Sequence, residues 1–409
     1  MRGQRPGTGA LAILLALALF FVPTAGAAPA AGPEGLEAEA WTVVDARSGD
    51  VLASKAAQRR LAIASTTKLM TAYVAMRELG PETMVRAAPY EPIYGESLMG
   101  LEAGERVSVR DLLYGLLLVS GNDAAHTLAV ASSGSEARFV AEMNRYAAAL
   151  GLADTHYANS IGLDQRGNYS TAADLATLAR RLLRLPAFAE VADTNSVLLR
   201  SLRPPRRIDN SNDLLGTVPW VTGVKTGHTF DAGYVLVASG ERDGVSLVSV
   251  TIGAPTEEAR FLENLELLEF GFSRYQRRVP IRSGEDLAEP EIRYSGGRLP
   301  LRAQRSLQVG VRADQRLALQ VDAPGEVEGP LRRGRRLGEA TVLVDGRRIG
   351  VVPLLASRAV PEASLFDRTR ATVADNLIPI AIALFVILII GVILLRRLAR
   401  RNDFRSRIG

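Results

Sequence analysis

The sequence contains no cysteine, so the protein can use neither disulfide bonds for stability nor a thiol for catalysis. It has only three histidines, His126, His156 and His228, with no H-E-x-x-H pattern and no cluster of metal-ligand spacing around them. No G-x-S-x-G pattern occurs, so the usual sequence support for a Ser-His-Asp hydrolase is missing. These absences predict a protein that works without a metal or a cofactor.

An excess of one charge sign is also missing from most of the chain. The full sequence carries 49 Lys and Arg against 44 Asp and Glu. Two of the basic residues lie in the first 27 residues, and six others lie with Asp403 after Leu395. The remainder therefore has 41 basic and 43 acidic residues, a net charge of about −2. This balance gives no support to nucleic-acid binding.

The first 27 residues have the pattern of a secretory signal peptide. Two arginines precede an apolar run over 10–22, which is followed by the small residues Ala25-Gly26-Ala27. Residues 28–37 are rich in Ala, Pro, Gly and Glu and predict a linker. We therefore expect the rest of the chain to be exported.

The C-terminal end predicts a transmembrane helix. Residues 377–395 carry no charge, and at about 1.5 Å per residue such a helix reaches about 28 Å, close to the hydrocarbon thickness of a bilayer. Residues 396–409 carry six arginines, so the positive-inside rule makes this basic tail cytoplasmic. The expectation is a single-pass protein of the cell membrane with its main part outside the cytoplasm.

Residues 38–276 predict an α+β domain in which helices pack against one antiparallel sheet. Strands are expected at 41–46, 51–54, 221–225, 233–239 and 245–253. Helices are expected at 66–79, 108–119, 136–150, 172–185 and 257–270. Residues 277–364 show short apolar alternations between Gly, Pro and Arg clusters, which predict a small all-β domain whose partner the sequence does not indicate.

Lysine is nearly absent from the sequence. Only Lys55, Lys68 and Lys225 occur, against 46 arginines. Arginine serves wherever a positive charge is enough, so a retained lysine indicates a site that needs an amine able to lose its proton. Lys55 is interpreted as a surface charge, whereas the other two lysines lie beside hydroxyl side chains.

Three short patterns contain these two lysines and follow one another in a set order. Ser65-Thr66-Thr67-Lys68 places a hydroxyl and an amine on one face of a helix start, where the amine can take the hydroxyl proton. Ser120-Gly121-Asn122 offers a proton relay and an amide, and Lys225-Thr226-Gly227 ends a strand where the backbone can approach a substrate. Each pattern alone is weak, but the three together are the signature of penicillin-recognising serine enzymes.

Residues 38–276 resemble the low-molecular-mass penicillin-binding proteins of the serine D-alanyl-D-alanine carboxypeptidase type. The likeness extends to Ser97-Leu98-Met99, to Asn159-Ser160-Ile161-Gly162-Leu163 and to the stretch from Gly223 to Thr229. It implies a DD-peptidase/β-lactamase-like antiparallel sheet with helices, followed by a C-terminal domain that the small all-β domain resembles. The expected transmembrane helix at 377–395 departs from the family, which commonly docks on the membrane through an amphipathic helix. It also implies that peptidoglycan stem peptides are the substrates and that β-lactam antibiotics acylate the enzyme.

The resemblance further implies a role for each matching residue. Ser65 attacks the carbonyl between the two terminal D-alanines with Lys68 as general base, and Ser120 and Lys225 relay a proton to the leaving amine. The backbone N–H groups of Ser65 and His228 hold the oxyanion. The expected substrate-binding residues are Asn122, Lys225, Thr226, Gly227, His228 and Arg260, the last of which matches the family's position for an arginine that binds the terminal carboxylate.

Three other functions share parts of this pattern. A class A β-lactamase needs a deacylating glutamate after the Ser-x-Asn pattern, but Asp154 to Ala158 fills that region with Asp-Thr-His-Tyr-Ala. A DD-endopeptidase of the same fold would cut cross-links in place of the terminal D-alanine, and the sequence does not separate the two activities completely. A penicillin-binding sensor that does not turn over remains a further alternative.

Overall fold

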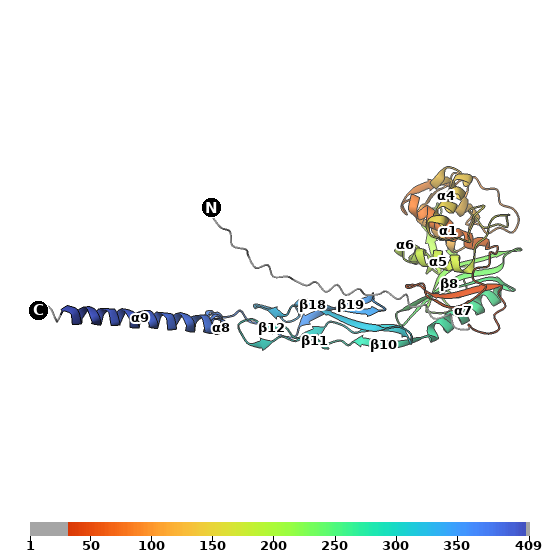
Figure 1. Ribbon diagram of the computed structural model, residues 1–409. Coiled ribbons are helices and arrows are strands. Elements are labelled where there is room, and N and C mark those ends of the chain that lie inside the picture. Colours follow the sequence, from red (N-terminus) through yellow and green to blue (C-terminus); the bar gives the residue numbers. More distant parts are fainter. Residues whose placement is uncertain (1–31, 406–409) are drawn as a thin grey trace, which may run out of the picture.

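The computed structural model describes residues 32–405, so the predicted signal peptide, its cleavage site and the last four residues lie outside the described part. Figure 1 shows an elongated molecule in which a layered domain of helices and a sheet is followed by a slender β-rich region and a long C-terminal helix. The mixed architecture with antiparallel sheets is the one that the sequence predicts.

A five-stranded antiparallel sheet runs through the layered domain. Its order is β2-β1-β9-β8-β7, and its strands are β1 (Ala40–Asp45), β2 (Val51–Lys55), β7 (Val221–Thr229), β8 (Gly233–Arg242) and β9 (Val245–Ala254). The N-terminal hairpin therefore joins the last strands of the domain, with Ala40 opposite Ile252. Strand β7 lies at the edge of this sheet, so one side of its backbone has no strand partner in the described chain.

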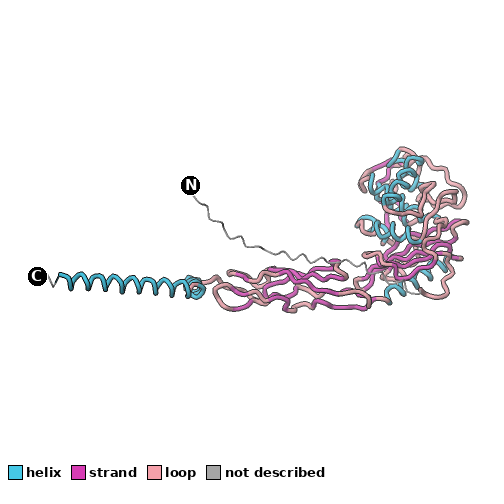
Figure 2. The backbone as a smooth tube through the Cα atoms, in the orientation of Figure 1, coloured by secondary structure: helices cyan, strands magenta, loops and turns pink. Residues whose placement is uncertain are grey.

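Both faces of the sheet are apolar, and both are covered by helices (Figures 1 and 2). Side chains of a strand alternate between the two faces. Val235 and Val237 of β8 accordingly belong to the core under the N-terminal helices, whereas Leu236 and Ala238 belong to the core under α7 (Glu257–Ser273). The helical elements before β7 are η1 (Ala64–Thr67), α1 (Lys68–Glu78), α2 (Val109–Leu117), α3 (Asn122–Ser133), α4 (Glu136–Ala149), α5 (Ala172–Leu182) and α6 (Pro186–Ala192).

Four helices of the layered domain, α2, α4, α5 and α7, begin with a hydroxyl side chain as N-cap. The capping oxygens, each of which accepts a backbone N–H three residues later, belong to Ser108, Ser135, Thr171 and Thr256. The five predicted helices are confirmed, with ends that differ by a few residues. Helices α3 and α6 were not predicted, because α3 begins inside the Ser-Gly-Asn segment without a side-chain cap bond and α6 is short. The short strands β3 (Met84–Arg86), β4 (Arg106–Ser108), β5 (Ser196–Leu199) and β6 (Arg206–Asp209) were not predicted either.

The β-rich region encloses a separate apolar core. Its strands form three sheets, and the largest has the order β11-β14-β19-β18-β16. The apolar alternations at 307–311, 317–321, 340–344 and 350–355 fall on β15, β16, β18 and β19. The strands are β10 (Tyr275–Ile281), β11 (Asp286–Ala288), β12 (Glu291–Ile292), β13 (Gly297–Arg298), β14 (Leu301–Ala303), β15 (Leu307–Arg312), β16 (Leu317–Asp322), β17 (Glu326–Val327), β18 (Arg336–Val344) and β19 (Arg347–Ala356).

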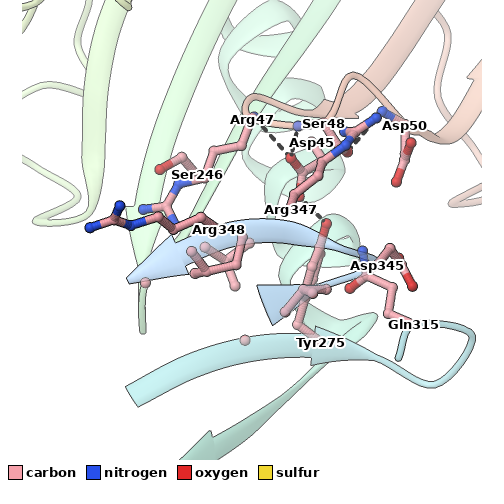
Figure 3. Close-up of a pocket in the computed structure, with 15 residues that line it drawn as sticks. Asp45, Arg47, Ser48, Asp50, Ser246, Tyr275, Gln315, Asp345, Arg347 and Arg348 are labelled. Atoms are coloured by element: carbon pink, nitrogen blue, oxygen red, sulfur yellow. Dashed lines mark hydrogen bonds between the residues drawn. The ribbon is translucent and has the colours of Figure 1, made fainter. Parts of the chain in front are cut away.

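The β-rich region meets the layered domain at the turn between β1 and β2. The Tyr275 hydroxyl donates a hydrogen bond to Asp45 Oδ2 at 2.6 Å, and the Arg312 guanidinium pairs with Asp50 at 2.7 Å. Tyr275, Asp45 and Asp50 border a cavity of about 420 Å³ at this junction (Figure 3). None of the predicted site residues lines this cavity, so its polar contacts join the two parts of the molecule and take no part in the predicted chemistry.

Two helices end the described chain, α8 (Leu365–Asp375) and α9 (Leu377–Arg405). Helix α9 contains the apolar residues 377–395 and continues without a break into the arginine-rich tail. Within residues 32–405, however, no helix was found with both the length and the apolar character needed to cross a membrane. The predicted transmembrane helix is therefore not confirmed.

Candidate active site

Ser65 and Lys68 lie at the junction of η1 and α1. One turn of helix separates them, so the two side chains share a face and Lys68 Nζ lies 3.0 Å from Ser65 Oγ. Ser65 is partly exposed, whereas Lys68 is fully buried. Ala64, directly before the serine, has a φ of 48°, a strained conformation of the kind that gathers at functional sites.

The Lys68 amine is held by two further oxygen atoms. Its Nζ donates to Asn122 Oδ1 at 2.6 Å and to the backbone carbonyl of Ile161 at 2.5 Å. Burial lowers the pKa of Lys68 from its usual value of 10.5 to about 7, and the carboxylates of Glu96 and Asp123 oppose this shift. A neutral amine that donates to Asn122 and Ile161 has its lone pair left for the serine hydroxyl, which is the arrangement of a general base.

The Ile161 carbonyl is presented by a tight loop. Asn159 Oδ1 accepts hydrogen bonds from the backbone N–H groups of Ile161 and Gly162. Gly162 has a φ of 90°, and a Cβ at this position would lie 2.1 Å from the carbonyl oxygen of Ala64. The loop can therefore approach the nucleophile only because residue 162 is glycine.

The Ser120-Gly121-Asn122 segment connects α2 to α3. Ser120 has a φ of 61°, and its buried Oγ has no hydrogen-bond partner in the described chain. Asp123 accepts hydrogen bonds from the backbone N–H groups of Met99, Gly100 and Leu101, each at 2.8 Å. This carboxylate thereby attaches the loop around residue 99 to the start of α3.

Strand β7 brings the third pattern to the nucleophile. A Cβ on Gly227 would lie 3.1 Å from the backbone nitrogen of Ser65, so the absence of a side chain permits the close approach of β7 to η1. Lys225 is buried, and burial lowers its pKa well below 10.5, with the positive charges of Lys68 and Arg260 adding to the effect. The Thr226 hydroxyl lies 3.0 Å from that of Ser211.

Arg260 enters the same region from α7. It is 4% exposed, and its guanidinium donates to the carbonyl of Gly227 at 3.3 Å and pairs with Glu257. Its Nε is buried without a hydrogen-bond partner in the described chain. His228 is exposed and stacks on Tyr234 with ring centroids 4.1 Å apart, and in the described structure its imidazole forms no hydrogen bond to Ser65 or Lys68.

The structure thus brings the three patterns together around one partly exposed serine. Ser65, Lys68 and Asn122 form a direct hydrogen-bonded chain, and Lys225 and Arg260 lie close enough to influence one another electrostatically. Two groups at the site were not predicted from the sequence: Glu96, which accepts a hydrogen bond from Asn122 Nδ2 at 2.9 Å, and the Ile161 carbonyl. Nothing in the sequence separates Glu96 from other acidic loop residues, although it directly precedes Ser97-Leu98-Met99.

Within residues 32–405, no group of three or more His, Cys, Asp or Glu side chains is arranged to hold a metal ion.

Known proteins match this chain over most of its length. D-alanyl-D-alanine carboxypeptidase DacC of Escherichia coli K12 is 32% identical over 373 residues, which cover 86% of this chain and 92% of DacC. D-alanyl-D-alanine carboxypeptidase DacB2 of Mycobacterium tuberculosis is 38% identical over 229 residues, which cover 56% of this chain and 77% of DacB2.

Solved structures of penicillin-binding proteins and a family profile also match this chain. The crystal structure of penicillin-binding protein 5 from Haemophilus influenzae superposes with a TM-score of 0.57 at 29% identity, covering 81% of this chain and all of that one. The profile of peptidase family S11, described as D-alanyl-D-alanine carboxypeptidase, matches residues 27–256. With the three patterns assembled around Ser65, this chain belongs to peptidase family S11, the serine D-alanyl-D-alanine carboxypeptidases.

Proposed function

We propose that Ser65 is the nucleophile with which this carboxypeptidase removes the terminal D-alanine from peptidoglycan stem peptides. The observation that carries the proposal is the buried Lys68 amine, with a pKa of about 7 and its nitrogen 3.0 Å from Ser65 Oγ. A catalytic base works best when its pKa lies near the pH of the reaction.

The proposed reaction passes through an acyl-enzyme. Lys68 takes the proton of Ser65, the serine oxygen bonds to the carbonyl carbon between the two D-alanines, and the C–N bond breaks. The leaving amine receives a proton by way of Ser120 and Lys225, and water then hydrolyses the ester. The unpartnered Oγ of Ser120 and the lowered pKa of Lys225 support this relay. A β-lactam follows the same first steps when its ring amide is attacked.

The substrate is proposed to lie along the free edge of β7 as an added strand. The backbone N–H groups of Ser65 and His228 would hold the oxyanion, and Asn122 would hold the peptide backbone. The terminal carboxylate would meet Thr226 and Arg260. The close approach of Gly227 to Ser65 and the bond between Arg260 and the Gly227 carbonyl support this placement.

The direct test measures free D-alanine from a diacyl-lysyl-D-alanyl-D-alanine peptide, together with penicillin labelling of the detergent-solubilised full chain. Ser65→Ala is expected to abolish both signals, whereas Ser54→Ala on the exposed surface of β2 should retain them. Labelling that survives in Ser65→Ala would place the nucleophile elsewhere. A parent protein that is labelled but releases no D-alanine would support the endopeptidase or sensor alternative.

We further propose that α9 attaches the enzyme to the cytoplasmic membrane and that residues 277–364 form a spacer domain between membrane and active site. Large apolar side chains on α9 are exposed, including Ile378 at 75%, Ile382 at 60% and Phe385 at 63%. An apolar surface of this kind is unfavourable in water and favours insertion into lipid. In Figure 1 the β-rich region lies between the layered domain and α9, which supports the spacer role.

A further inference from the structure

The Lys68 amine depends on the orientation of a neighbouring amide. The Asn122 side chain ends in an oxygen that accepts and a nitrogen that donates, and its oxygen faces Lys68 Nζ at 2.6 Å. If this amide were rotated by half a turn, its N–H groups would face the amine. Lys68 would then have to accept from Asn122 with the lone pair that it needs for Ser65.

Glu96 removes this ambiguity. Its Oε2 accepts a hydrogen bond from Asn122 Nδ2 at 2.9 Å, and the Tyr90 hydroxyl donates to the same oxygen. A carboxylate can only accept, so the amide nitrogen of Asn122 has to face Glu96 and its oxygen has to face Lys68. The loop that carries Glu96 is also attached to Asn122 through the backbone, because the N–H of Asn122 donates to the carbonyl of Ser97 at 2.8 Å.

We propose that Glu96 is a positioning residue that fixes the amide of Asn122, and through it directs the lone pair of Lys68 at Ser65, with Tyr90 holding Glu96 in place. This inference rests on the proposed function, in which Lys68 is the base. Glu96 acts through Asn122, because it forms no bond to Ser65 or Lys68 in the described structure.

Glu96 also changes the electrostatics of the base. The charged groups that act on the Lys68 amine are the carboxylates of Glu96 and Asp123. Lys68 in turn lowers the pKa of Lys225 on β7, as does Arg260 on α7. Asp123 has its oxygens engaged by the N–H groups of Met99, Gly100 and Leu101. Glu96 raises the pKa of Lys68, so removing its negative charge lowers that pKa. A larger fraction of Lys68 is then neutral at low pH, and the acid limb of kcat/KM moves to lower pH.

The experiment measures kcat/KM for D-alanine release and the acylation rate with a chromogenic cephalosporin, over a pH range on both sides of about 7, the pKa of Lys68. In Glu96→Gln the pH-independent maximum of kcat/KM should fall roughly tenfold, because the amide of Asn122 is no longer held in one orientation. Its acid limb should move to lower pH. The matched control is Glu91→Gln, on an exposed part of the same loop, which should behave like the parent.

Tyr90→Phe provides the second variant. It removes one hydrogen bond to Glu96 and keeps the carboxylate charge, so its maximum kcat/KM should fall while the acid limb of its pH profile stays where the parent has it.

A Glu96→Gln enzyme with the maximum kcat/KM and pH profile of the parent would overturn the proposal. So would a lower maximum with an unmoved acid limb, which indicates a structural role alone. If Glu96→Gln does not fold, as judged by thermal unfolding, a parent-like maximum in Tyr90→Phe overturns it. A parent enzyme with no acid limb near the Lys68 pKa would instead contradict the proposed function itself.

Discussion

Single residues at the site show why lysine is kept in a chain that otherwise uses arginine. Lys68 and Lys225 are 0% and 1% exposed, and burial lowers the pKa of both. A guanidinium would stay charged at such a position and would have no lone pair to offer. Lys55, by contrast, is exposed and donates to the carbonyls of Leu36 and Ala38, in agreement with its interpretation as a surface residue.

The terminal carboxylate of the substrate provides a test at the residue scale. Arg260→Ala should reduce kcat/KM for the diacyl tripeptide about 10- to 100-fold, because a buried charge partner of the carboxylate is lost. The C-terminally amidated peptide should be affected much less. The measurement is the ratio of kcat/KM for the two peptides, compared with Arg278→Ala on the exposed side of β10. An equal loss on both peptides would show that Arg260 acts only by packing.

At the scale of the elements, loops and a strand edge meet the start of α1 and complete the site. The 159–163 loop contributes a carbonyl to Lys68, the loop around residue 96 contributes a carboxylate to Asn122, and β7 approaches the nucleophile at Gly227. The 159–163 loop and β7 come close to the nucleophile because the glycines at 162 and 227 leave room for the backbone contact. The loop around residue 96 is held by a hydrogen bond to a buried polar side chain, Asn122.

Glycine substitutions test this close packing. Gly162→Ala should lower the free energy of unfolding by more than about 1 kcal/mol, the usual cost of forcing alanine into a left-handed conformation, because its Cβ would also collide with the Ala64 carbonyl. It should also slow acylation of Ser65, since the Ile161 carbonyl moves. Gly151→Ala is the control, with a φ of 75° and nothing within 4 Å of the added atom. Denaturant unfolding and acylation rates of the two variants give the answer, and equal behaviour would contradict the steric argument.

For the whole molecule, the proposed arrangement separates attachment from chemistry. The layered domain holds the complete set of predicted site residues, and the β-rich region joins it through Tyr275, Arg312 and the β1–β2 turn. Nothing in the described site depends on α8 or α9.

A chain that ends at residue 364 is therefore expected to leave the membrane fraction and remain soluble. Its rate of D-alanine release should equal that of the detergent-solubilised full chain, because every contact around Ser65 lies before this point. Fractionation followed by the D-alanine assay checks both statements. A truncated protein that still sediments with membranes would show that another surface provides the attachment.

The features that could be predicted from the amino-acid sequence are those that are local along the chain. The strands of the main sheet and the five predicted helices follow from apolar alternation, helix-forming residues and helix start and stop signals, and the scarcity of lysine points to Lys68 and Lys225. These features depend on neighbouring residues, so they can be seen without knowing the fold.

Which distant groups meet depends on the packed fold and could not be predicted from the sequence. The Ile161 carbonyl and Asn122 reach Lys68, Glu96 reaches Asn122, and Gly227 reaches Ser65 across long separations in sequence. A carbonyl or a loop glutamate has no local pattern that reveals such a role. The distances between these groups are set by the packing of the sheet against its helices, and so are the desolvation and the neighbouring charges that bring the pKa of Lys68 to about 7.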